Sequence, residues 1–392
     1  MKNPALIIIG LILSLQTMAQ KPEPIYGFAR ERKSVKWYNI QRDLWKKEVE
    51  TNPKNANAWY NYYRVTKNLV NCDTMDKRPR HERWNDLKAI VETMEKHIPE
   101  TYEYNYCKFS IEGNNFDFLP YLLKADELSN GRTIHTDYMI NWGEIERNIE
   151  RRDKYCHQWF ESGNVSPGLM YYNYNVMIGV KPNAIILTAG DNDTYPAWIL
   201  QAKGVRKDVL VLNFSLMRID AYRAKIFKQL GIETWDFDLK AYEKDSNHKV
   251  KNKFEEELLR HLIKNKYKYP VYLALTAFDA KSYNNSIADK LYLTGLTYEY
   301  SEKPIDNIAI MKRNFEQNFA LDYIEKPFYQ DISAPIVKSL HANYIVPMIK
   351  LYEHYKLSGE TQKMTDIKAD LLAVSKGSEE EKSVIKLLET KE

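Results

Sequence analysis

The clearest pattern along the chain is an apolar run at residues 184–189 that leads into the polar segment Gly190-Asp191-Asn192-Asp193-Thr194. Because apolar and polar positions do not alternate in it, the run is typical of a strand that is buried on both faces of a parallel sheet. Tyr195-Pro196 follows, and proline suits the first turn of a helix. The pattern predicts a buried strand, an acidic turn and a helix that starts near Tyr195.

Further apolar runs in the middle of the chain predict more strands. They occupy residues 209–214, 271–275 and 291–298, where Gly295 indicates a bulge. Between them, apolar positions recur at helical spacing. Strands that alternate with helices predict an α/β core with a mostly parallel, Rossmann-like sheet, which we place at residues 176–304.

Both flanks of this core have helical patterns. Apolar positions recur at helical spacing through residues 35–175 and again through residues 305–375. A charged lead with prolines at residues 20–34 is expected to be flexible. Residues 376–392 form a charged tail with one short amphipathic stretch.

The first helical region has a feature of a known repeat. A turn at Asn52-Pro53 and a helix that opens at Asn57, with Trp59 near its start, resemble the tetratricopeptide repeat. Tyr62 and Tyr63 stand where that repeat has Leu-Gly, and the spacing to the next such turn, at Pro99, exceeds the repeat length of about 34 residues. The pattern predicts an irregular, tetratricopeptide-like layer, and a plain helical bundle is the alternative.

Residues 1–19 have the pattern of a signal peptide. Lys2 gives a basic start, residues 5–15 form an apolar run, and small residues precede a cut after Ala19. The run is shorter than the roughly 20 apolar residues that cross a membrane, and no later stretch has that length. We expect a periplasmic or secreted protein without a membrane span.

Composition excludes some classes of function. The net charge of +4 is small beside 57 basic and 53 acidic residues, so no nucleic-acid partner is expected. Cys72, Cys107 and Cys156 are the only cysteines. Two of them could pair in an exported protein, and the sequence does not say which. Their wide spacing argues against a zinc site.

The acidic turn also carries a family resemblance. Residues 187–198, with the series Gly-Asp-Asn-Asp-Thr-Tyr-Pro, resemble the soluble C-terminal region of bacterial protein O-mannosyltransferase-like multi-pass membrane proteins. The similarity continues in the same order through roughly residues 182–372. In that family the transfer chemistry is expected in the membrane region, which this chain lacks. The resemblance therefore implies a link to envelope glycans or protein glycosylation, without the transferase activity.

The turn is also the strongest candidate site, because open α/β sheets bind ligands at the carboxyl ends of their strands. Asp191-x-Asp193 offers the oxygen ligands that Mg²⁺, Mn²⁺ or Ca²⁺ prefer. The alternative is structural, with one aspartate capping the helix and the other closing the turn. Tyr195 and Trp198 could form an apolar wall for a sugar ring. The predicted ligand-binding residues are Asp191, Asn192, Asp193, Thr194, Tyr195, Trp198 and Asn213.

These patterns favour a binding or scaffolding role over catalysis. No Ser-His-Asp, Cys-His or His-Glu arrangement stands out among the eight histidines, and the sequence has no glycine-rich phosphate loop. We expect an exported binding protein without a cofactor, whose helical-repeat surface takes a protein or glycan partner. The alternative is a carbohydrate-active enzyme or sugar-binding module that uses a crevice at Asp191 and Asp193, with or without a divalent metal.

Overall fold

The computed structural model describes residues 21–113, 115–235, 237, 239, 253–264, 269–278, 285–325 and 330–390. The predicted signal peptide, residues 1–19, lies outside them. Contacts within the chain define two compact units, the first ending at His135 and the second starting at Thr136.

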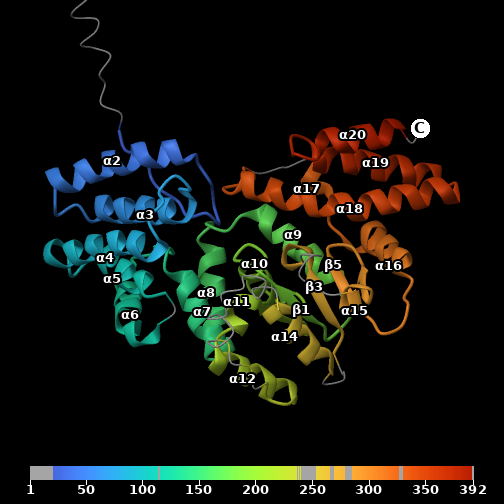
Figure 1. The fold of residues 1–392 in the computed structure, drawn as a ribbon, viewed down its shortest axis with the longest axis horizontal. Coiled ribbons are helices and arrows are strands. Elements are labelled where there is room, and N and C mark those ends of the chain that lie inside the picture. The colour runs from blue at the N-terminus through green and yellow to red at the C-terminus, as the bar shows by residue number, and fades with distance from the viewer. Residues whose placement is uncertain are drawn as a thin grey trace, which may run out of the picture. The chain divides into compact units, whose positions relative to one another are not determined.

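The first unit is helical (Figure 1). Asparagine and serine side chains start its first two long helices: Ser34 accepts a hydrogen bond from Trp37 N, and Asn55 accepts one from Ala58 N. Consecutive helices pack on one another, and α5 also packs on α3. The elements are α2 (Val35–Thr51), α3 (Ala56–Cys72), α4 (Arg80–His97), α5 (Tyr102–Ile111), η1 (Phe116–Phe118) and α6 (Leu119–Glu127).

The segment before α2 is held against the first two helices. Ile25 N donates to Asn61 Oδ1 at 2.8 Å, and the Trp45 indole donates to the carbonyl of Glu23 at 2.9 Å. Asn68 donates to the carbonyl of Tyr26 at 2.9 Å. Buried side chains of α2 and α3 thus satisfy backbone groups that have no strand or helix partner of their own.

The second unit contains a small sheet among many helices. It begins with α7 (Thr136–Ile145), α8 (Ile149–Glu161), α9 (Pro167–Ile178), β1 (Ile185–Thr188), α10 (Tyr195–Ala202), β2 (Leu210–Asn213), α11 (Phe214–Met217), α12 (Asp220–Leu230) and α14 (Lys253–Lys264). It continues with β3 (Val271–Ala274), η3 (Leu275–Ala277), α15 (Asn285–Ala288), β4 (Leu291–Leu293), β5 (Thr297–Tyr300), α16 (Asn307–Arg313) and the π-helix η5 (Asn314–Asn318). The last elements are α17 (Asp322–Glu325), α18 (Ala334–Ser358), α19 (Thr361–Ser375) and α20 (Glu381–Thr390).

The predicted fold class, an α/β core with a mostly parallel sheet, is wrong. The strand order is β2-β1-β3-β5-β4, and β1 is parallel to β2 and β3, whereas β5 is antiparallel to both β3 and β4. The apolar run at residues 291–298 is a tight hairpin, in which Gly295 has a φ of 132° that favours glycine. The hairpin reverses the chain, so the sheet is small and mixed, and the chain as a whole is mostly helical.

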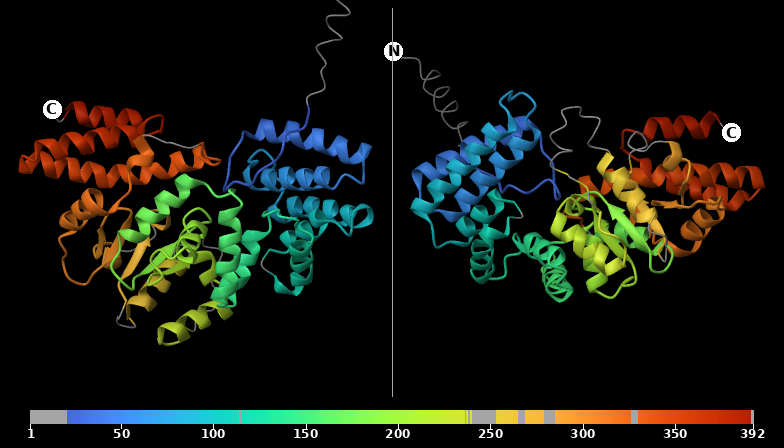
Figure 2. Two further views of the ribbon diagram at one scale, coloured as in Figure 1. Left: turned by 180° about the vertical axis from the view of Figure 1, so that it is seen from behind. Right: turned by 60° about the horizontal axis from the view of Figure 1, so that its bottom comes forward.

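Helices cover both faces of the sheet (Figure 1). Across the sheet, the connection from β1 to β2 through α10 moves toward the β2 edge, whereas the connection from β2 to β3 moves back past β1 in the opposite direction. Right-handed crossovers therefore place α10 and α12 on opposite faces. Helix α10 also packs on α8 and α9. The final helices α18, α19 and α20 lie side by side (Figure 2), so part of the predicted charged tail is an ordered helix.

Helix α9 packs on both α10 and α18. The Asn175 amide donates to the Tyr344 hydroxyl at 2.8 Å, and its oxygen accepts from Ala320 N at 2.8 Å. The Asp331 carboxylate accepts from Gly168 N in the first turn of α9. Within the described part of the chain, no helix combines the length and apolar character that a membrane span requires.

Candidate functional site

The acidic turn lies where the sequence predicts it, between β1 and α10. Gly190 and Asp191 are exposed, whereas Asp193 is only 3% exposed. Its carboxylate points back to the end of β1, where Ala189 N donates to Oδ2 at 2.9 Å and Gly190 N donates to Oδ1 at 2.7 Å. The Thr276 hydroxyl, just past β3, also donates to Oδ2. Asp193 thus joins the carboxyl ends of two neighbouring strands.

These contacts favour one part of the structural alternative, in which an aspartate closes the turn, but not the part in which an aspartate caps the helix. The first residue of α10, Tyr195, donates its N–H to the carbonyl of Asp191 at 3.0 Å, and no side chain caps the helix. Both carboxylate oxygens of Asp193 already accept hydrogen bonds, so a cation would have to displace backbone donors. No group of three or more acidic, histidine or cysteine side chains that could hold a metal ion occurs among the described residues.

The remaining polar residues of the predicted site come together at the same edge. The Asn213 amide, at the end of β2, donates to the Thr194 hydroxyl at 3.0 Å and to the carbonyl of Gly190 at 3.5 Å. The Thr194 hydroxyl also lies 2.7 Å from that of Thr188. Asn213 Oδ1 accepts from Ser215 N at the start of α11. These side chains mainly bond one another and the backbone, which ties the strand ends together.

Tyr195 and Trp198 are buried and do not line an open crevice, and Asn192 is half-buried. The carbonyl of Asn192 accepts a hydrogen bond from the Asn173 amide at 2.8 Å. Trp198 is 1% exposed, and its indole donates to the carbonyl of Val211 at 3.3 Å. Tyr195 is also buried, with its ring 5.6 Å from that of Trp159. The predicted apolar wall for a sugar ring is therefore part of the core.

The indole of Trp198 forms a hydrogen bond to the backbone of β2 that was not predicted from the sequence. Strand β2 is an edge strand, and its outward carbonyls need partners if the edge is not to pair with another chain. Trp198 donates to Val211 O, and the Gln201 amide donates to Val209 O. Two side chains of α10 thus cover this edge of the sheet.

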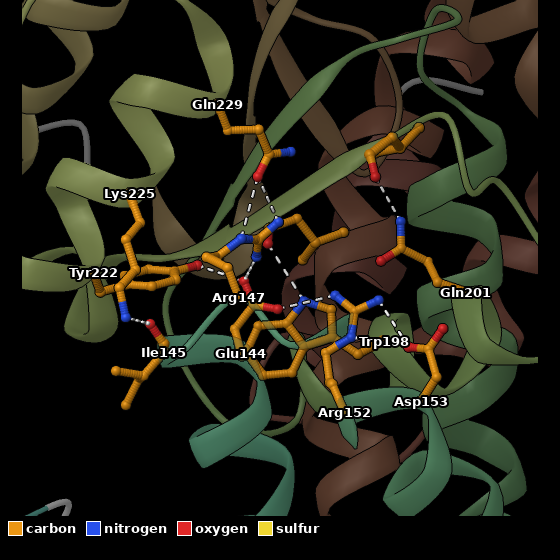
Figure 3. Close-up of polar contacts among 12 residues, drawn as sticks. Glu144, Ile145, Arg147, Arg152, Asp153, Trp198, Gln201, Tyr222, Lys225 and Gln229 are labelled. Carbon is orange, nitrogen blue, oxygen red and sulfur yellow. Dashed lines mark hydrogen bonds and ion pairs between the residues drawn. The ribbon is translucent and has the colours of Figure 1, made fainter. Parts of the chain in front are cut away.

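A buried charge cluster in the same unit was not predicted from the sequence (Figure 3). Glu144 of α7 is fully buried, and its carboxylate accepts from Arg147, from Arg152 at 3.0 Å and from the Tyr222 hydroxyl at 2.6 Å. Asp153 accepts from Arg152 at 2.9 Å. Two acids thus face two arginines, so the cluster is electrically balanced, as buried charges must be.

Partners from three helices hold this cluster. Gln229 of α12 accepts from Arg147 Nε at 3.2 Å and from Nη2 at 2.9 Å (Figure 3). Burial by itself would lower the pKa of Arg152, but Glu144 and Asp153 outweigh it and raise that pKa. Burial, and then Glu144, raises the pKa of the Tyr222 hydroxyl well above its usual value. Arg152 is therefore cationic and Tyr222 neutral throughout the physiological pH range.

Local sequence explains how α7 and α8 come close enough to build the cluster. A Cβ on Gly143 would lie 2.6 Å from Arg152 N, so only glycine permits this approach. Arg147 adopts a φ of 55° in the turn between the helices, and Asn148 accepts from Arg151 N to start α8. The one available sequence signal was Glu144 itself, a charge within the otherwise apolar end of α7.

A pocket of about 420 Å³ adjoins the cluster. It lies at the amino ends of β1 and β2, since the first residues of these strands, Ile185 and Leu210, line it. The predicted site is at the opposite, carboxyl ends. Polar side chains that line the pocket are Arg147, Arg152, Asp153, Asn183, Gln201, Lys207, Asp208, Gln229 and Tyr269.

The first unit has a larger groove, of about 640 Å³, between α2, α3 and α4. Val49, Leu69, Val70 and Ile90 contribute apolar lining. The rings of Trp59 and Tyr62 lie with their centroids 6.4 Å apart and also line it. Charged side chains of both signs complete the lining, and they are Arg42, Asp43, Lys46, Glu50, Asp73, Asp76, Arg78, Arg83 and Asp86.

None of the three cysteines is in a disulfide. Cys107 and Cys156 are buried, and Cys72 is half-buried. Burial raises the pKa of the Cys156 thiol to about 12, and it raises the pKa of Cys72 as well. These thiols are protonated at neutral pH, which makes them poor nucleophiles and metal ligands.

Burial of Asp193 gives a testable pH dependence. Desolvation raises its pKa above 3.8, although hydrogen bonds from Thr276, Ala189 and Gly190 oppose the rise. A raised pKa in the folded state stabilises the fold most below the unfolded pKa, and this contribution is lost as pH rises through the folded value. We expect the stability of the wild type relative to Asp193→Asn to fall as the pH rises from the unfolded pKa of 3.8 through the raised folded pKa of Asp193. Urea unfolding of both proteins across this range measures it, and a difference that grows with pH would show that the fold favours the ionised carboxylate.

Comparison with known proteins agrees in part with the resemblance noted from the sequence. No curated protein matches the chain. A family model described as TMEM260-associated domain 2 matches residues 170–257. The matched stretch contains β1, the acidic turn, α10, the edge strand β2 and α12. Over these residues, the second unit of this chain is similar to TMEM260-associated domain 2.

Proposed function

We propose that this chain is an exported binding protein that holds an extended segment of another protein in the groove between α2, α3 and α4. The observation that carries this proposal is the groove itself, whose volume of about 640 Å³ lies in the range of specific binding sites. Its surface combines aromatic and aliphatic side chains with charges, as peptide-binding surfaces do. The proposed export rests on the predicted signal peptide.

The charges around the groove are already organised in pairs. Arg78 contacts Asp76 at 2.8 Å and Asp86 at 2.9 Å, and Arg42 contacts Asp43 at 3.0 Å. Hydrogen bonds from Arg78 hold the pKa of Asp76 at about 2, so this acid is ionised at neutral pH. Ordered pairs of both signs select a partner by charge pattern more than they add affinity. We therefore propose a partner segment that carries charges of both signs beside an apolar anchor.

A link to glycosylation belongs to the same proposal. The match to TMEM260-associated domain 2 supports it, as does the resemblance of residues 187–198 to the soluble region of O-mannosyltransferase-like proteins. We propose that the second unit brings the chain to an envelope glycosylation system, while the helical first unit binds the protein client. The alternative, a carbohydrate site at Asp191 and Asp193, has less support, because the Asp193 carboxylate is committed to strand-end donors.

The groove proposal predicts that Tyr62→Ala weakens partner binding about tenfold or more. Tyrosine in a partly buried pocket is a typical binding hot spot, and losing one costs about 2 kcal/mol or more. The measurement is fluorescence anisotropy of the mature chain with peptides selected from a random display library.

Tyr60→Ala is the matched control. Tyr60 lies on the same helix and is half-buried like Tyr62, but its ring packs against Tyr106, 5.9 Å away, and does not line the groove. Its replacement should leave the dissociation constant within about twofold. The proposal is wrong if the library yields no selective binder, or if both substitutions weaken binding equally.

A further inference from the structure

The pocket at the amino ends of β1 and β2 presents two partly used guanidinium groups. Arg147 donates three hydrogen bonds, to Glu144 and Gln229, and Arg152 donates three, to Glu144 and Asp153. Each guanidinium carries five N–H groups. Two donors on each arginine therefore have no partner within the part of the chain that the structure describes. Both side chains line the pocket and are held in place by other residues (Figure 3).

The charges around this pocket leave one cation in excess. Glu144 and Asp153 balance the two arginines, and Asp208 pairs with Arg206 at 2.9 Å. Lys207, exposed at the pocket, has no ion pair with any described residue. An occupant with a single negative charge would complete the balance.

Further hydrogen-bonding groups without a partner among the described residues surround the pocket. The side-chain amide of Asn183 makes no hydrogen bond with described residues, and neither does the amide nitrogen of Gln229. Asp153 uses only Oδ1 toward Arg152, which leaves Oδ2 as an acceptor. Hydroxyl groups, which both donate and accept, suit such a mixture of donors and acceptors.

The backbone at the pocket is in uncommon conformations. Arg147 has a φ of 55° and Asn183 a φ of 56°, and both line the pocket. Such conformations cost free energy and occur often at binding sites, where they fix side-chain positions. The backbone conformations of Arg147 and Asn183 therefore fix the positions from which their side chains reach the pocket.

We propose that this pocket binds a small polyhydroxylated carboxylate, an acidic sugar of the uronate class. Its carboxylate accepts from the two guanidinium groups and Lys207, which matches the planar, bidentate geometry that arginine offers carboxylates. Its hydroxyls bond Asn183, Gln229 and Asp153. The volume of about 420 Å³ lies within the range of small-molecule sites. The proposal does not depend on the groove of the first unit.

Isothermal titration of the mature chain with sodium glucuronate tests the proposal. We expect saturable binding of one glucuronate per chain, and binding at least about tenfold weaker for glucose, which lacks the carboxylate, and for acetate, which lacks the hydroxyls. Inorganic phosphate should also bind at least about tenfold more weakly. The site would be a general anion site, and the proposal wrong, if phosphate or acetate bound as tightly as glucuronate.

Two variants locate the binding. Lys207→Gln should raise the dissociation constant for glucuronate about tenfold, whereas the exposed control Lys303→Gln should leave it within about twofold. Asn183→Gly keeps the positive φ without a penalty and removes the amide, so it should weaken glucuronate binding while the melting temperature is kept. The proposal is overturned if glucuronate does not bind the wild type, if both lysine variants weaken it equally, or if neither Lys207→Gln nor Asn183→Gly weakens it.

Discussion

Glu144→Ala is expected to destabilise the second unit by about 3–5 kcal/mol, because it leaves buried charges without their partner. The substitution removes the acceptor shared by Arg147, Arg152 and the Tyr222 hydroxyl. Asp153 and Gln229 remain, but they contact only parts of the two guanidinium groups. Urea unfolding followed by circular dichroism measures the loss.

Glu146→Ala is the matched control two positions further on. Glu146 is exposed and pairs with Lys225 at 2.8 Å. An exposed ion pair contributes about 0–1 kcal/mol, so this variant should unfold close to the wild type. Equal losses in the two variants would show that the Glu144 cluster does not stabilise the fold through its burial.

Asp193→Ala is expected to cost about 1–3 kcal/mol at neutral pH, since it leaves donors at the ends of two strands without an acceptor. Ala189 N and Gly190 N come from the end of β1, and the Thr276 hydroxyl lies beyond β3. The same urea experiment measures this loss. The expectation differs from that for a capping residue, because Asp193 does not cap α10.

Asp191→Asn provides the control within the same turn. Asp191 is exposed, and its backbone carbonyl, which the substitution keeps, accepts from Tyr195 N. We expect the free energy of unfolding to stay within about 0.5 kcal/mol of the wild type, as for most surface substitutions. A loss from Asp191→Asn as large as that from Asp193→Ala would mean that the whole turn, and not the buried carboxylate, joins the strands.

The sequence predicts a ligand site at the carboxyl ends of the parallel strands, whereas the pocket proposed above as a ligand site lies at their amino ends. At the carboxyl ends, where α/β sheets usually bind ligands, Asp193, Thr194 and Asn213 bond one another and the backbone. At the amino ends, a pocket retains arginine donors and a lysine without an ion-pair partner among the described residues. Polar residues at a strand end are therefore a guide to a site only if their hydrogen-bonding capacity is left unused.

Local features of the fold could be predicted from the sequence, because they depend on neighbouring residues. The apolar run at residues 184–189 contains β1, since a strand covered on both faces needs apolar side chains at every position. Helix α10 begins at Tyr195, next to the proline that suits its first turn. In each case a few adjacent residues set both burial and backbone geometry.

The tertiary structure alone decided the sheet type and the chemistry of both strand ends. The antiparallel pairing of Leu273 with Tyr298 makes the sheet mixed, and the direction of a strand relative to a distant partner leaves no local pattern. The role of Asp193 depends on Thr276, 83 positions away, and that of Glu144 on Tyr222, 78 positions away. Burial and hydrogen-bond partners of a carboxylate arise only when distant elements pack together. Aspartate and glutamate side chains can therefore form either a ligand site or a structural cross-link, depending on which residues the fold places beside them.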